Sequence, residues 1–155
     1  MPIYHIQVNG DVDDGNGNKK RIDPRIALRD RGPVIRVKLE FPANITQQLA
    51  QDGKPIPKPI SGFALIDTGA SSTSIDDSAA TKLGLPIIDK GKLTSATHNA
   101  IDVNIYPSLI SFTGTPIKVN APRAIGANLS SQKIIALIGR DIFKDLTLFY
   151  NGPAG

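Results

Sequence analysis

Apolar and polar side chains alternate along several short stretches of the chain, and this alternation predicts β-strands. The clearest stretch is residues 34–41, where every second side chain is apolar and most of those between are charged. Such alternation is typical of a half-buried antiparallel strand. Further strands are predicted at residues 63–66, 101–112 and 133–138, with a short one at residues 3–8. These stretches predict an all-β protein.

Helical signals are few. Residues 76–83 begin with two aspartates and are followed by Gly84 and Pro86, which are start and stop signals of a short helix. Asp76 and Asp77 are therefore interpreted as helix-terminus charges and not as catalytic groups. A second short helix is predicted at residues 141–146. The proline-rich residues 42–62 are predicted to be a long loop with one helical turn at residues 45–50.

One stretch places a carboxylate in a short polar loop between two apolar segments. Residues 63–66 form an apolar run that is too short for a helix, so we interpret it as a buried strand that ends at Asp67. Thr68 and Gly69 then turn the chain. Asp-Thr-Gly by itself is equally compatible with an ordinary turn. A second motif, I-I-A-L-I-G-R-D-I-F at residues 134–143, favours a functional interpretation.

Together the two motifs resemble those of the retropepsin-like aspartic proteases. The resemblance extends over about residues 33–150, with Asp-Thr-Gly-Ala and Ile-Gly-Arg-Asp about 70 residues apart. It implies an all-β, single-lobe acid protease fold with one or two short helices, active as a two-fold dimer. Residues 1–32 would be an N-terminal strand and basic arm. Residues 33–155 would be the protease domain, with an insertion at about residues 42–62 that we expect to form a wall specific to this protein.

The resemblance also implies roles for individual residues. Asp67 would be the catalytic acid and base, Thr68 would bond across the dimer, and Gly69 would let the substrate backbone lie close. The implied residues are Asp67 for catalysis; Thr68, Gly69 and Ala70 in the supporting loop; Gly139, Arg140 and Asp141 behind the site; and Ser95, Ala96, Thr97, His98 and Asn99 in a flap that contacts substrate.

The sequence departs from the family pattern at three places. Viral members have an acidic partner for the arginine just after the Ala of the loop, where this chain has Ser71. Either Asp76 or Asp141 replaces that partner or the ion pair is missing, and we expect Arg140 to be a buried structural anchor. The predicted flap tip has no glycine. The turn signal at residues 151–153 normally introduces another strand, so we expect either that a final strand has been removed or that the chain ends early.

The chemistry of peptide hydrolysis by carboxylates requires two of them, one ionised and one protonated. Because the chain contains a single Asp-Thr-Gly, the resemblance implies a homodimer that pairs two copies of Asp67 and cleaves a peptide or protein substrate. The alternative is a catalytically weak or inactive module of the same fold that dimerises or binds peptides.

Composition excludes several other classes of site. The chain has no Cys and two His, so we expect no metal and no cofactor. The net charge is +4, and the basic residues 19–38 are interpreted as a solvated arm, with a nucleic-acid partner as the weakest alternative. No apolar run reaches the roughly 20 residues of a membrane span. We therefore expect an intracellular, cytoplasmic protein with no membrane partner.

Overall fold

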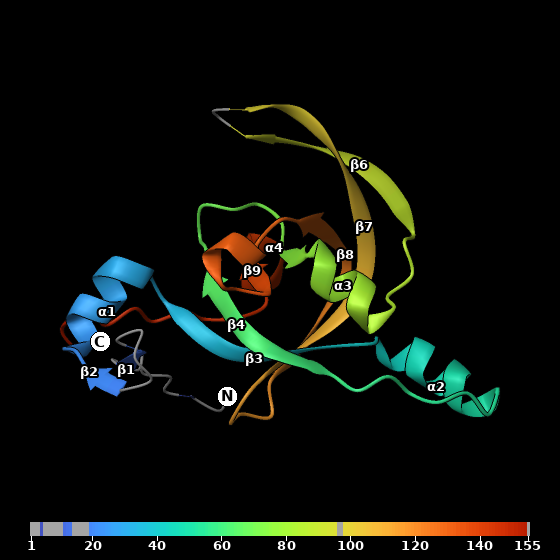
Figure 1. Cartoon of the computed structure of the whole chain (residues 1–155), viewed down its shortest axis with the longest axis horizontal. Coiled ribbons are helices and arrows are strands. Elements are labelled where there is room, and N and C mark those ends of the chain that lie inside the picture. Colours follow the sequence, from blue (N-terminus) through green and yellow to red (C-terminus); the bar gives the residue numbers. More distant parts are fainter. Residues whose placement is uncertain (1–3, 5–10, 14–18, 96–97, 155) are drawn as a thin grey trace.

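The computed structural model describes residues 4, 11–13, 19–95 and 98–154 of the chain. Its main feature is a seven-stranded sheet in the order β3-β4-β9-β5-β8-β7-β6. An additional pairing of β3 with β7 closes all of these strands except β6 into a barrel (Figure 1). The sheet consists of β3 (Val34–Glu40), β4 (Ile60–Ile66), β5 (Ser74–Asp76), β6 (Asp89–Ser95), β7 (His98–Phe112), β8 (Lys118–Ala127) and β9 (Ala136–Ile138).

The remaining elements are short. Strands β1 (Asp11–Asp13) and β2 (Lys19–Arg21) pair with each other in a separate hairpin. The helices are α1 (Pro24–Arg31), α2 (Ala43–Gln51), α3 (Asp77–Leu83) and α4 (Arg140–Phe143), with 3₁₀ turns at Ser130–Gln132 and Gly152–Ala154.

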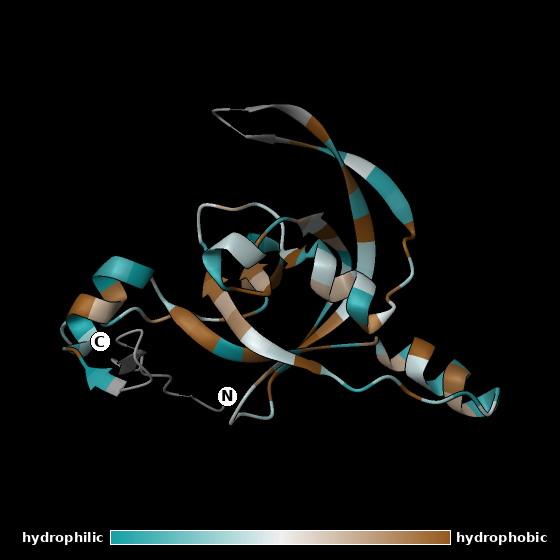
Figure 2. Cartoon of the chain, viewed as in Figure 1, coloured by the Kyte–Doolittle hydropathy of each residue, from teal (hydrophilic) through white to brown (hydrophobic). Residues whose placement is uncertain are grey.

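The core lies inside the barrel. Strand β3 alternates buried and exposed positions as predicted, with Val37 and Leu39 each 1% exposed. They belong to the same apolar cluster as Ile75, Ile110 and Ile138 from other strands. The alternating colours along β3, β7 and β8 in Figure 2 show the same two-sided pattern. Burial of one face of each strand is therefore what selects this sheet from the sequence.

Strand β9 lies between β4 and β5 and sets the geometry of the loop that joins them. It pairs in parallel with β4, through Ile66 and Ile138, and antiparallel with β5, through Ile75 and Ala136. The chain that leaves β4 must cross the end of β9 to return as β5. Residues 67–73 form this crossing, and they contain the Asp-Thr-Gly motif.

The all-β class predicted from the sequence is confirmed. The predicted number of short helices, one or two, is lower than the number in the structure. The described residues contain four α-helices, of which α3 begins after Asp76 as predicted. Helix α1 was not predicted within the basic arm, although Asp23 caps it, Pro24 begins it and Gly32 follows it. Among residues 3–8, where a strand was predicted, only Tyr4 belongs to the described part of the chain.

Within one chain, the insertion at residues 42–62 lies at the end of β4 away from the Asp67 loop, and the wall that it was expected to form stays a prediction. Its residues 42–59 lie between β3 and β4, where Leu39 pairs with Ile60. Asp67 follows the other end of β4, about 20 Å away at the usual rise per residue of a strand. Helix α2 contains no buried residue, and in Figure 1 it projects away from the barrel.

A buried carboxylate joins helix α3 to the turn after β8. Asp76 is 3% exposed; it accepts hydrogen bonds from the backbone amides of Leu129 (2.9 Å), Ser130 (3.0 Å) and Ala79 (3.1 Å) and from the hydroxyl of Ser78. Burial by itself raises the pKa of this carboxyl, but the hydrogen bonds outweigh burial and lower the pKa below the ordinary value of 3.8.

We predict that this interaction makes the fold sensitive to acid. Because the folded-state pKa of Asp76 is lowered, its stabilising contribution is complete above about pH 4 and is lost as the pH falls through the folded-state pKa. Asp76→Asn should lower the free energy of unfolding at pH 7 by about 2 kcal/mol. In urea denaturation the difference between the two proteins should shrink by pH 2.5. An equal difference at both pH values, or an equal loss in the exposed control Asp145→Asn, would contradict this.

Candidate active site

Asp67 is held at the end of β4 by its own loop. Its backbone amide donates to the carbonyl of Ile138 (3.0 Å), which continues the pairing of β4 with β9. Its side-chain Oδ1 accepts hydrogen bonds from the backbone amides of Gly69 (2.8 Å) and Ala70 (3.2 Å). The orientation of the carboxylate is therefore fixed by backbone donors that follow it directly in the sequence.

The second carboxylate oxygen of Asp67, Oδ2, differs from Oδ1 in its hydrogen bonding. Among the described residues, no donor forms a hydrogen bond with Oδ2. The side chain is partly exposed, and Thr68 and Gly69 beside it are exposed. One oxygen thus holds the loop in shape while the other is free to bind water, substrate or a second carboxyl group.

The other end of the loop is fixed by a hydrogen-bond network behind Asp67. Thr73 is fully buried; its hydroxyl donates to Asp141 Oδ1 (2.8 Å) and accepts from the amide of Gly139 (3.0 Å). The amide of Thr73 donates to Asp141 Oδ2 (3.0 Å). The amide and hydroxyl of this threonine are therefore tied to the β9–α4 junction, and its carbonyl accepts from the amide of Ile125 in β8 (3.1 Å). Thr73 was not among the residues predicted for the site, because in the sequence it is one of four neighbouring hydroxyl residues at positions 71–74.

Gly139 is required because two backbone segments nearly touch. A Cβ at this position would lie 2.6 Å from the carbonyl carbon of Ser72 and 2.9 Å from the amide nitrogen of Thr73. Both are backbone atoms, so a side chain cannot be accommodated by moving a flexible group. Directly after Gly139, the amides of Arg140 and Asp141 donate to the carbonyls of Ala70 (3.0 Å) and Ser71 (3.2 Å). The predicted supporting residues thus pack directly on the Asp67 loop.

Arg140 differs from its prediction. Its guanidinium donates to the backbone carbonyls of Thr68 and Gly69, both at 3.0 Å, and its side chain is exposed and not buried. Neither Asp76 nor Asp141 is its partner, because these carboxylates bind the turn after β8 and Thr73. The buried ion pair is therefore replaced by hydrogen bonds from a cation to the carbonyls of the Asp-Thr-Gly turn.

The predicted flap coincides with the hairpin formed by β6 and β7. Ser95 pairs with His98 near its tip, and Asn99 lies in β7. Ala96 and Thr97 lie outside the described residues. In Figure 1 the hairpin extends beyond the barrel and curves over the side where β4 ends. The backbone thus provides a long hairpin where the sequence predicted one, and its contact with substrate stays a prediction.

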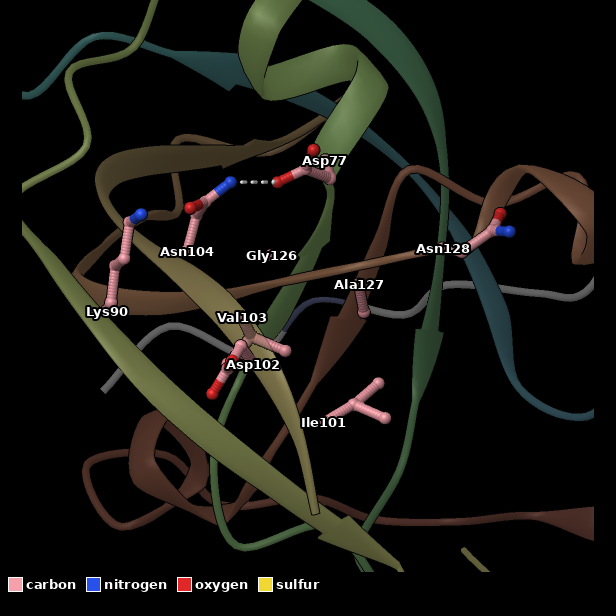
Figure 3. A pocket seen from close by; sticks show the side chains of 9 residues that line it. All are labelled: Asp77, Lys90, Ile101, Asp102, Val103, Asn104, Gly126, Ala127 and Asn128. Atoms are coloured by element: carbon pink, nitrogen blue, oxygen red, sulfur yellow. Dashed lines mark hydrogen bonds between the residues drawn. The ribbon is translucent and has the colours of Figure 1, made fainter. Parts of the chain in front are cut away.

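A pocket lies at the base of this hairpin, away from the Asp67 loop. It has a volume of ≈ 270 Å³, and its walls come from β6, β7, the end of β8 and the start of α3 (Figure 3). No residue of the loop 67–73 lines it. Within the described part of the chain, no group of three acidic or histidine side chains could hold a metal ion. No described helix is long and apolar enough to cross a membrane.

Comparison with known proteins gives one family match. The sequence model of a family described as aspartyl protease matches residues 58–142, which include both motifs. No curated protein matches the chain.

Three solved structures are similar to this chain. The simian foamy virus (mac) protease is 14% identical (TM-score 0.45, covering 72% of this chain and 91% of that one). The EIAV protease complexed with the inhibitor HBY-793 is 20% identical (TM-score 0.41, 58% and 83%). The retroviral protease-like domain of Ddi1 from Leishmania major is 14% identical (TM-score 0.39, 72% and 76%).

We predict that Gly139→Ala weakens the fold at the site. The added methyl group would force apart the backbone of Ser72 and the β9–α4 junction, at a cost of about 3 kcal/mol. Urea denaturation should show this loss. Gly91→Ala is a suitable control, because a Cβ there would lie 3.4 Å or more from its neighbours. Equal stability of the Gly139→Ala protein and the parent would contradict the required close approach.

Proposed function

Because this chain belongs to the aspartyl protease family, we propose that it is a retropepsin-like endopeptidase whose active site combines Asp67 from two copies of the chain. The observation that carries this proposal is the free Oδ2 of Asp67, on a carboxylate whose other oxygen is fixed by Gly69 and Ala70. A rigid carboxylate with one available oxygen suits a group that must share a proton with a second carboxyl group.

The chemistry follows from the pairing of like charges. Two carboxyl groups about 3 Å apart cannot both ionise, so one proton is shared between them. The ionised member takes a proton from a water molecule, which attacks the carbonyl carbon of the peptide. The protonated member donates to the carbonyl oxygen, and the departing amine then receives a proton as the C–N bond breaks. No covalent bond to the enzyme forms at any step.

A two-fold dimer is proposed because one chain supplies a single Asp-Thr-Gly. A closed two-fold axis brings the same residue of each copy together, and Asp67 has to lie at that axis. Thr68 is exposed beside it, and no hydrogen bond of its hydroxyl occurs among the described residues. This hydroxyl is available to bond across the axis and to fix the two loops relative to each other.

The proposed substrate is a peptide segment in extended conformation. The exposed Gly69, without a side chain, allows substrate backbone to approach the carboxylates. The β6–β7 hairpin would cover the bound peptide from the opposite side and exclude water from the reaction. The family assignment supports proteolysis; the dimer, the flap and the substrate belong to this proposal.

A second candidate is a module of the same fold that dimerises or binds peptides with little or no catalysis. The observation that favours it is Arg140, which is exposed and binds backbone carbonyls in place of a carboxylate. If the purified dimer cleaves no member of a diverse peptide library between about pH 3 and pH 7, a range that spans the titration of a shared-proton pair, this second function replaces the first.

We predict that Asp67→Asn abolishes peptide cleavage without unfolding the protein. Asparagine keeps the size of the side chain and its acceptor oxygen for Gly69, but it cannot act as a base. The measurement is peptide hydrolysis together with circular dichroism, and Asp52→Asn, in the insertion at the far end of β4, is the matched control. Activity retained by the Asp67→Asn protein would mean that another group or another protein performs the cleavage.

We also predict that Thr68→Ala weakens the dimer more than the single chain. Loss of a hydrogen bond across the axis costs roughly 1 kcal/mol, and an unpaired partner adds to this. Sedimentation equilibrium should show about a fivefold or larger rise in the dimer dissociation constant. The free energy of unfolding of the monomer, measured in urea, should change little, because Thr68 is exposed in the single chain. An unchanged dissociation constant would exclude Thr68 from the interface.

A further inference from the structure

The β6–β7 hairpin leaves the barrel at a defined point on β7. From Ile105 to Ser111, β7 pairs with β8 of the barrel. From Ile101 to Asn104, β7 pairs with β6 alone among the described strands. Asn104 is therefore the first residue on the hairpin side of this boundary, and Tyr106 lies just inside the barrel. We call residues 104–106 the hairpin root.

Two carboxylates tie this root to its surroundings. Asp89 of β6, which pairs with Ile105, forms an exposed ion pair with Arg123 of β8 (2.6 Å), and the carboxylate of Asp77 contacts both sides of the boundary on β7. Oδ1 of Asp77, in the first turn of α3, accepts hydrogen bonds from Asn104 Nδ2 (3.1 Å) and from Tyr106 Oη (2.7 Å). Figure 3 shows Asn104 pointing across the pocket edge toward Asp77. One donor belongs to the hairpin and the other to the barrel, and Asn104 Nδ2 also donates to Tyr106 Oη (3.3 Å). These three residues are called the Asp77 latch below.

The surroundings of the latch preserve it. A Cβ on Gly126 of β8 would lie 2.7 Å from Asp77 Oδ1 and 2.9 Å from the ring of Tyr106, so only glycine leaves room for this carboxylate. Tyr106 is 1% exposed, and its burial, together with its hydrogen bond to Asp77, raises its pKa above 10.0. The tyrosine therefore remains a neutral donor throughout the range in which a carboxylate pair works.

The latch also connects the hairpin to the candidate site. Asp77 follows β5 directly, and β5 follows the loop 67–73 in the sequence. The pocket of ≈ 270 Å³ lies beside the latch, and Asp77, Lys90 and Asn104 are among the residues that line it. We expect this space to let the root shift when the hydrogen bond to Asp77 is broken.

The geometry points to Asp77 as a positioning residue that sets the angle of the β6–β7 hairpin relative to the Asp67 loop through its bond to Asn104. The hairpin covers substrate only if the proposed function is correct, but its angle is a property of the folded chain. Loss of the bond frees the hairpin to populate a displaced orientation, whereas the barrel strands keep theirs.

Distance measurements between two spin labels test this inference without any substrate. The chain has no Cys, so labels can be attached to Lys92→Cys on β6 and Lys118→Cys on β8. Labelled chains are mixed with excess unlabelled chains so that each dimer carries one pair. A second pair, Lys82→Cys on α3 with Lys118→Cys, reports on the barrel and α3 alone.

The test substitution is Asn104→Leu, which removes the donor at similar size, and Asn120→Leu on β8 is the matched control. With Asn104→Leu the displaced population of the 92–118 distance should rise about tenfold, as expected for loss of one hydrogen bond to a charged group. The 82–118 distance should not change. An unaltered 92–118 distribution, an equal change with Asn120→Leu, or an equal change in both distances would overturn the inference.

An exchange of side chains provides a rescue. Asn104→Asp alone places two carboxylates face to face and should displace the hairpin more than Asn104→Leu does. Adding Asp77→Asn restores a donor and acceptor between the two positions and keeps an acceptor for Tyr106. The double variant should recover the parent distance distribution. If it stays as displaced as Asn104→Asp, the latch does not set the hairpin angle, whether or not the chain cleaves peptides.

Discussion

The close approach of two backbone segments behind Asp67 is the constraint on which the rest of the site depends. Gly139 lets the end of β9 lie against Ser72 and Thr73 without an intervening side chain. The hydroxyl of Thr73 and the carboxylate of Asp141 then replace the sheet hydrogen bonds that the loop cannot make. Because both ends of the loop are fixed, Asp67 keeps one orientation, which the proposed sharing of a proton with a second carboxyl group requires.

Much of this arrangement could be predicted from the sequence because it depends on local patterns. Alternation at residues 34–41 predicted β3, and the apolar run before Asp67 predicted the end of β4. The pairing of the two motifs predicted that Gly139 and Asp141 support the loop. The long-range partners were not predictable: Thr73 looked like one hydroxyl among several, and the carbonyls that bind Arg140 have no sequence signal.

The structure combines a loop that is fixed at both ends with a hairpin that extends from the barrel. Hydrogen bonds fix both ends of the loop 67–73. In the hairpin, by contrast, residues 101–104 of β7 pair with β6 alone, and Asn104 donates a hydrogen bond to the carboxylate of Asp77 in α3. Acid is expected to have opposite effects on the proposed activity and on the stability of the fold. In the proposed mechanism a proton shared between carboxyl groups favours activity at mildly acidic pH, whereas Asp76 loses its stabilising effect as the pH falls through its lowered pKa. We therefore expect stability to limit the proposed activity on the acid side.

The central claim is that each active site takes one Asp67 from each of two chains, and subunit mixing tests it most directly. Parent and Asp67→Asn chains are unfolded together, refolded at varied ratios, and assayed at constant total protein. If both carboxylates are required, mixed dimers are inactive and activity follows the square of the parent fraction, falling to about one quarter at an equal ratio. A linear fall, to about one half, would show that a single chain contains a complete site and would contradict the account.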